Sequence, residues 1–270
     1  MACSKLFSGD LPEISTYIIQ NLRNNFNTLY SLALVNRFWC RLAIPLLWED
    51  PFSIKCRKNI VPHFLDIYFL FLNDTDKSKW KEIKFLDDSK LKKPLFHYPS
   101  LIKTLNSYRM ELHVANWISA SYNITPISAQ LFPLTSAEPY ELRYETSDVD
   151  EEKTNVVRIA LFKLFIENNA SLNNLNMNIG NNTYQFTYDI CDIVLNNPKF
   201  ISEIFHFEFF DYFYSLSYNK SFETFLSSFT SPIKHIGFCS KNLEVRKNFT
   251  NIIQRTQLSS ITFWHIYLIL

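Results

Sequence analysis

The sequence predicts an α/β protein in which three short N-terminal helices precede a solenoid of strand–helix repeats. Three observations favour this fold class. Apolar residues recur at helical spacing in the first fifty residues, and short apolar strands alternate with helix-like segments in the last hundred. In addition, 47% of the 270 residues are hydrophobic and the net charge is only +1, so the chain can bury a large core and is not disordered.

The first helix has a clear start signal. Asp10 is the expected N-cap, Pro12 suits the first turn, and Glu13 stands at the spacing of a capping box. One helical face then carries four apolar residues: Ile14, Ile18, Ile19 and Leu22.

Two more helices are expected before residue 50. One begins near Asn27, and the other contains Phe38, Trp39 and Leu42 before Pro45 interrupts it, because proline removes a hydrogen-bond donor. Three helices in about 40 residues bury too little surface to be very stable alone. We therefore expect this unit to pack on a neighbour or to bind a partner.

The motifs of this segment, in their order and spacing, resemble an F-box. The family pattern has an opening Leu-Pro-x-Glu, an aliphatic pair one turn later, a central Leu-x-x-Val-(Asn/Ser)-(Lys/Arg)-x-Trp and a closing Pro-Leu-Leu-Trp. The corresponding residues here are Leu11-Pro12-Glu13, Ile18-Ile19, Leu32 to Trp39, and Pro45-Leu46-Leu47-Trp48. The closing LAIPLLWEDPF is similar to F-box proteins of expanded fungal families.

The resemblance implies a function in protein degradation. An F-box at residues 1–52 would dock on a Skp-family adaptor and, through it, on a cullin, as the substrate-recognition subunit of an E3 ubiquitin ligase. An unknown protein would be the substrate, and tethering it would promote ubiquitination by proximity. The adaptor contacts that the resemblance implies, some of them expected to be internal core, are Leu11, Pro12, Ile14, Ile18, Leu34, Val35 and Trp39.

The middle of the chain is less regular. Residues 61–72 are strongly apolar and predict a buried helix, residues 79–85 alternate like a strand, and residues 95–105 and 111–119 suggest two more helices. Three prolines between residues 125 and 150 predict an irregular connection.

Residues 53–270 are predicted to form a leucine-rich-repeat-like substrate-binding region. Four helix-like segments are each followed by an apolar strand pattern that starts at Leu172, Ile201, Ile233 or Leu258, which is close to the length of a leucine-rich repeat. The second unit departs most, because His206 occupies an apolar place, and an isolated earlier unit could start at Trp80. An ordinary α/β domain with coincidental spacing is the alternative.

Alternation along such strands predicts a concave surface for substrate. Asn176, Thr262 and Trp264 fall between the apolar positions and are the candidate substrate contacts. No polar cap follows the last strand, so we expect an exposed C-terminal edge or one covered by a partner.

No motif predicts catalysis, a metal or a cofactor. The three glycines are far apart, which excludes the common phosphate-binding loops, and none of the six histidines has the spacing of a sequence-local metal site. The five dispersed cysteines are expected to be free thiols, with Cys191 a small buried hydrophobe rather than a nucleophile. We therefore expect a non-enzymatic protein.

The remaining features limit partners and compartment. The basic excess over residues 51–110 is expected to be a solvated surface rather than a nucleic-acid site, since no reading motif accompanies it. No signal peptide or membrane span is evident, so a cytoplasmic or nuclear location is expected.

Two alternatives to the ligase subunit remain open. In the first, the chain is a non-ligase repeat scaffold whose F-box-like helices only cap the solenoid. In the second, a hydrolase assembles its residues from distant positions.

Overall fold

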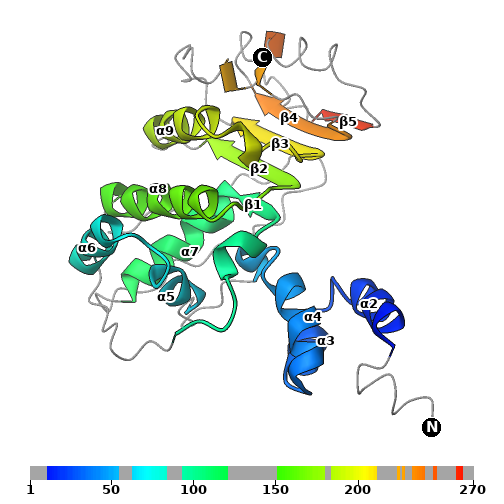
Figure 1. Ribbon diagram of the computed structural model, residues 1–270. Coiled ribbons are helices and arrows are strands. Elements are labelled where there is room, and N and C mark those ends of the chain that lie inside the picture. The colour runs from blue at the N-terminus through cyan, green and yellow to red at the C-terminus, as the bar shows by residue number, and fades with distance from the viewer. Residues whose placement is uncertain are drawn as a thin grey trace.

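The computed structural model contains a parallel β-sheet with helices packed on one face, and three further helices at the N-terminal end (Figure 1). This confirms the expected α/β class. The residues that the structure describes are 11–54, 63–83, 93–120, 151–179, 184–211, 224–225, 227–228, 233–240, 246–247 and 260–263. For residues 260–263 only the backbone is described.

The three N-terminal helices are α2 (Pro12–Asn21), α3 (Phe26–Ala33) and α4 (Arg37–Leu47). Asparagine side chains begin two of them. Asn25 accepts a hydrogen bond from the backbone N–H of Thr28, and Asn36 accepts one from that of Trp39. Each cap satisfies a donor that the first helical turn leaves unpaired.

Two expectations for these helices concerned the N-cap of the first helix and the interruption of the third helix at Pro45. The N-cap of α2 is Leu11, without a side-chain cap bond, and the expected cap Asp10 lies outside the described residues. Pro45 does not interrupt α4, which continues to Leu47. A proline this close to the C-terminal end removes few helical hydrogen bonds, so the last turn still forms.

The strand expected at residues 79–85 is wrong as far as the structure describes it. Residues Asp74–Ile83 form α6, and the apolar residues Trp80 and Ile83 lie one turn apart on its buried side. Asn73 caps this helix by accepting from the N–H of Asp76 at 2.9 Å. The three-residue spacing fits a helical face as well as a strand motif, and the cap favours the helix. The isolated repeat unit expected at Trp80 is therefore absent.

The other central segments described here are two helices, a short 3-10 turn and a strand. Helix α5 (Phe64–Phe69) lies within the buried helix expected at 61–72. The helix expected over 95–105 is wrong: the chain there forms the 3-10 turn η3 (Tyr98–Leu101) and then β1 (Thr104–Asn106). Helix α7 (Ser107–Ser119) follows β1 directly and agrees with the helix expected over 111–119.

The sheet contains five parallel strands in the order in which they follow along the chain. They are β1, β2 (Asn174–Ile179), β3 (His206–Asp211), β4 (His235–Ser240) and β5 (Ser260–Phe263). Helix α8 (Glu151–Glu167) precedes β2, and α9 (Tyr184–Leu195) with the 3-10 turn η4 (Pro198–Phe200) precedes β3. Parallel pairing requires such crossover connections.

The strand register corrects the second repeat unit. Leu175 pairs with Phe207 and Met177 with Phe209, so Leu172 corresponds to Ile204 rather than to Ile201. Ile204, Phe207 and Phe209 are each at most 1% exposed. The second unit therefore keeps the apolar spacing, and the apparent exception at His206 came from a start assigned three residues too early.

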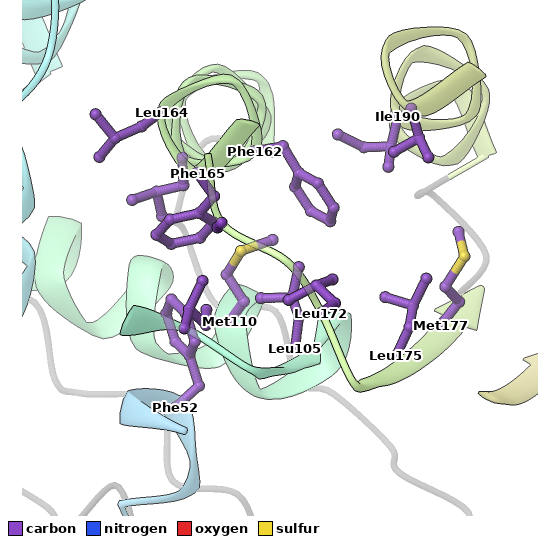
Figure 2. Close-up of a cluster of buried hydrophobic side chains, with 14 of the residues drawn as sticks. Phe52, Leu105, Met110, Phe162, Leu164, Phe165, Leu172, Leu175, Met177 and Ile190 are labelled. Atoms are coloured by element: carbon purple, nitrogen blue, oxygen red, sulfur yellow. The ribbon is translucent and has the colours of Figure 1, made fainter. Parts of the chain in front are cut away.

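The main core lies between the sheet and the helices that precede its strands. In Figure 2, Phe162 and Phe165 of α8 point toward Leu105 and Leu172, while Ile190 of α9 lies above Leu175 and Met177. Leu105, Leu175, Phe207 and Ile236 form a buried row across four strands. Because side chains alternate along a strand, the residues directly before and after each of these four lie on the opposite, polar face.

A repeated pair of hydrogen bonds connects successive units. At the start of β1, β2, β3 and β4, two consecutive backbone N–H groups donate to one carbonyl of the preceding segment. The donor pairs and their acceptors are Lys103 and Thr104 to Glu49, Asn173 and Asn174 to Lys103, Phe205 and His206 to Asn173, and Lys234 and His235 to Phe205. Glu49, directly after the N-terminal helices, therefore takes the place that a preceding strand would occupy.

The N-terminal helices have a core of their own. Ile19, Leu29, Trp39, Ala43 and Leu46 form a cluster separate from the main core. Phe52, which ends the expected F-box segment, is 1% exposed and packs in the main core instead.

Candidate functional site

Large apolar side chains are exposed on the N-terminal helices. Among the described residues, nine large apolar side chains are exposed, and six of them lie within this one unit. These six, here called the helical surface, are Ile14, Tyr17, Phe26, Tyr30, Leu34 and Val35. A concentration of this kind on a small unit is typical of a protein–protein contact, whereas isolated exposed hydrophobes need no explanation.

Most of the adaptor contacts that the resemblance implies are accessible. Leu34 is 71% exposed, Val35 53% and Ile14 50%, and Pro12 is also exposed. Leu11 and Ile18 are partly buried.

Trp39 differs from the other candidate contacts, because it is 1% exposed and lies in the N-terminal core. Its backbone N–H donates to the side-chain oxygen of Asn36, and its ring meets the Phe38 ring edge-on. Trp39 therefore holds the three helices together, and a partner could not reach its ring without opening that core.

Contacts around Trp48 and Glu49 join the N-terminal unit to the segment that leads into the sheet. The carbonyl of Glu49 accepts from the N–H groups of Lys103 and Thr104, both at 2.9 Å. The Glu49 carboxylate forms an ion pair with Arg23 at 3.1 Å, and the ring of Trp48 packs on Tyr98, 4.1 Å between centroids. These contacts join the end of α4 to the part of the chain that precedes α7 and the sheet (Figure 1).

The polar face of the sheet carries a connected set of side chains. The amide of Asn178 donates to Asn176 at 2.8 Å, and the amide of Asn176 donates to the Glu208 carboxylate. Glu208 in turn pairs with the ring of His206 at 3.2 Å, and that ring stacks on His235 with centroids 4.3 Å apart. We call these five residues the polar ladder, which crosses β2, β3 and β4.

Neighbouring groups shift the pKa values of two residues in the ladder. The hydrogen bond from His206 holds the pKa of Glu208 below its ordinary value, although partial burial opposes this effect. Partial burial, and then the nearby His206, lower the pKa of His235. At neutral pH the ladder therefore presents an ionised carboxylate beside an uncharged His235 ring.

The expected substrate contacts are only partly placed. Asn176 lies in the polar ladder, on the face where alternation predicted it. The backbone register sets Thr262 opposite Gly237 in the same row, and Trp264 lies outside the described residues. His206, Glu208 and His235 were missed, because the misplaced start of the second unit hid the fact that the two histidines occupy equivalent positions.

Burial shifts the pKa of two described groups outside the ladder, Cys191 and His113, toward their uncharged forms. Cys191 is fully buried, which raises the pKa of its thiol and keeps it protonated. His113 is 3% exposed and contacts the carbonyls of Phe52 and Ile54, and burial lowers its pKa. The three described cysteines, Cys40, Cys191 and Cys239, are free thiols.

Comparison with protein-family models, curated proteins and solved structures finds no match for this chain. Within the described ranges, no helix is both long enough and apolar enough to cross a bilayer.

Proposed function

We propose that this protein is the substrate-recognition subunit of a Skp–cullin–F-box ubiquitin ligase. The helical surface binds the Skp-family adaptor, and the polar face of the repeat-like sheet binds the protein to be ubiquitinated. The observation that carries the proposal is the helical surface itself. Its residues Ile14, Leu34 and Val35 coincide with the adaptor contacts that the F-box resemblance implies, and all three are exposed.

The packing of the three helices supports this proposal. An F-box must keep a small core of its own while leaving apolar side chains free for the adaptor. Trp39 and Leu29 supply the core here, and Leu34 and Val35 follow the end of α3 at the surface. Burial of such residues in a complex supplies the main driving force of association.

The junction at Glu49 supports the tethering mechanism. A ligase subunit contributes no chemical group and acts by holding its substrate near the conjugating enzyme. A fixed connection between the docking helices and the sheet limits the positions that a bound substrate can sample. The hydrogen bonds of Glu49 to Lys103 and Thr104, and the packing of Trp48, provide that connection.

Co-expression with a Skp-family adaptor tests the proposal. The parent chain should retain the adaptor and its cullin on affinity resin, while Leu34→Glu with Val35→Glu should reduce retention at least tenfold. Each of these positions is solvent-exposed, so the fold should persist.

Leu95→Glu is the matched control, because Leu95 is 81% exposed but lies outside the helical surface. It should leave adaptor retention unchanged. A folded parent chain that fails to retain the adaptor would exclude a ligase subunit and favour a plain repeat scaffold. Equal retention by the double variant would show that the helical surface is not the contact.

A further inference from the structure

The polar ladder contains a group of side chains suited to a metal ion. His206, Glu208 and His235 each offer one ligand atom, and these atoms all lie within 4.8 Å of one another. Among the residues that the structure describes, no other three His, Cys, Asp or Glu side chains meet this condition. We propose that His206, Glu208 and His235 bind a divalent transition-metal ion on the polar face of the sheet.

The donor set selects the class of metal. Two imidazoles and one carboxylate suit zinc and its neighbours in the first transition row, whereas calcium and magnesium prefer sites made entirely of oxygen. A tetrahedral zinc with bonds of about 2.1 Å needs ligand atoms roughly 3.4 Å apart. Binding therefore requires the three ligand atoms, which now lie within 4.8 Å of one another, to move closer together.

The sheet provides two ligands in register. His206 pairs directly with His235 on the adjacent parallel strand, so their side chains leave the same face at neighbouring positions. Glu208 lies two residues after His206 and therefore on the same face. The strand backbone thus fixes the spacing of all three ligands, as expected for a site built on rigid elements.

Asn176 positions the carboxylate. Its amide donates to Oε2 of Glu208, while Oε1 of Glu208 lies 3.2 Å from Nε2 of His206. One carboxylate oxygen is therefore held by the neighbouring strand and the other faces the imidazole. Partners of this kind orient metal ligands, and their loss typically weakens metal binding about 10–100-fold.

Gly237 provides the space that the carboxylate needs. It is paired with Glu208 in the register, and a Cβ at this position would lie 3.0 Å from Cγ and 3.6 Å from Cδ of Glu208. A side chain here would require the Glu208 side chain to shift by a few tenths of an ångström. Glycine is unfavourable in the interior of a strand, and the chain has only three glycines. The space needed by Glu208 gives a reason for one of them to lie inside β4.

The site is accessible from solvent. The side chains of His206 and Glu208 are 35% and 24% exposed, so an ion can enter without unfolding. Three protein ligands leave the fourth position of tetrahedral zinc open. That position faces away from the core and could receive a water molecule or a donor from a bound protein. The metal proposal does not depend on the ligase function, and its test uses neither adaptor nor substrate.

Competition titration of the full chain against a chromophoric zinc chelator tests the proposal, with Co²⁺ absorption as a second readout. The parent should bind one Zn²⁺ per chain at this site and give the intense d–d bands of a tetrahedral Co²⁺ complex. His206→Ala with His235→Ala should abolish both signals, and Glu208→Gln, which keeps the side-chain shape, should weaken binding at least tenfold.

Gly237→Ala keeps all three ligands but crowds the Glu208 side chain, so it should weaken zinc binding by less than Glu208→Gln does. His63→Ala is the control, since the His63 side chain is 81% exposed and distant in the sequence. Thermal unfolding without metal checks that each variant is folded. Zinc binding retained by the double histidine variant, as cysteine thiolates would give, would overturn the proposal. So would equal weakening by His63→Ala.

Discussion

At the scale of single residues, Asp50, which lies between the N-terminal helices and the sheet, has a carboxyl group that is costly to ionise. Burial raises the pKa of Asp50 to about 6, from an ordinary value of 3.8, although Arg109 and the N–H of Ser53 oppose the shift. Its Oδ1 atom is buried and has no hydrogen-bond partner among the described residues. Burial also raises the pKa of the neighbouring Tyr68, and the negative charge of Asp50 adds to that effect.

Asp50→Asn should therefore make the protein more stable at neutral pH. Between about pH 4 and 6 the folded chain holds a proton on Asp50 that the unfolded chain releases, so this group lowers stability as the pH rises through that window. At pH 7 the asparagine variant should have a free energy of unfolding higher by about 2 kcal/mol than the parent. Its stability should also no longer fall as the pH rises from about 4 to 6. Urea unfolding across this pH range measures both effects.

Asp192→Asn is the control for this experiment, because Asp192 is exposed on α9. It should change the free energy of unfolding by less than about 0.5 kcal/mol at either pH. If Asp50→Asn were as neutral as this control, the carboxyl would be better solvated than its burial indicates.

At the scale of elements, short polar side chains decide where helices begin. Asn25, Asn36, Asn73 and Asn106 each accept a hydrogen bond from the backbone N–H three residues later. These caps give part of the asparagine-rich composition a structural reason. They also explain why α6 forms where alternation alone indicated a strand.

Helix α8 carries a buried cation that its environment only partly compensates. Arg158 is 1% exposed, lies 3.2 Å from Glu111 and has its guanidinium 3.4 Å above the ring of Phe186. Its Nε and Nη2 atoms are buried without a hydrogen-bond partner in the described part of the chain. Burial lowers the pKa of this group despite the nearby carboxylate. The cost of removing an arginine from water thus offsets much of the gain from the pair.

Arg158→Met should keep the stability of the parent to within about 1 kcal/mol, because methionine fills similar volume without an unpaired charge. Arg158→Ala should lower the free energy of unfolding by about 3 kcal/mol, since it leaves a cavity beside Phe186. Chemical denaturation of both variants tests this order. Equal losses in the two variants would show that the charge pair itself is indispensable.

At the scale of the whole molecule, two separate hydrophobic cores meet around Trp48 and Glu49. The N-terminal core around Trp39 is small, and the main core extends from Phe52 to Phe238. The backbone donors of Lys103 and Thr104 connect them through Glu49. The two cores are therefore expected to respond separately to local damage.

Trp39→Ala should open the three N-terminal helices while the sheet remains folded. Loss of a buried tryptophan costs about 3–5 kcal/mol, which is more than so small a core can supply alone. Native-state hydrogen exchange should show lost protection in residues 12–47 and retained protection in β2 to β4. Adaptor retention should be lost as well.

Leu175→Ala is the comparison, because it removes a side chain of the main core that is 2% exposed. It should lower protection across β1, β2 and β3 by about 2–5 kcal/mol, because each strand pairs with the next. If Trp39→Ala lowered protection equally in the sheet, the molecule would be a single cooperative unit.

Local patterns in the chain were sufficient for the α/β class, the three N-terminal helices and the apolar spacing of the repeat-like strands. Burial periodicity and helix caps are properties of neighbouring residues, so they can be recognised without knowledge of the fold. The same patterns were ambiguous at Ile201 and Ile204, because both starts give an apolar residue three places later. They were also ambiguous around Trp80, where three-residue spacing suits either a strand motif or a helix.

Only the tertiary structure decided these cases and created the candidate sites. Pairing of Leu175 with Phe207 sets the second unit at Ile204, because only that register buries the apolar side chains of both strands on one face. The same register brings His206 and Glu208 beside His235. Packing likewise places Trp39 in the core while Leu34 and Val35 remain exposed. Contacts between residues distant in the chain depend on strand order and helix packing, which no local pattern specifies.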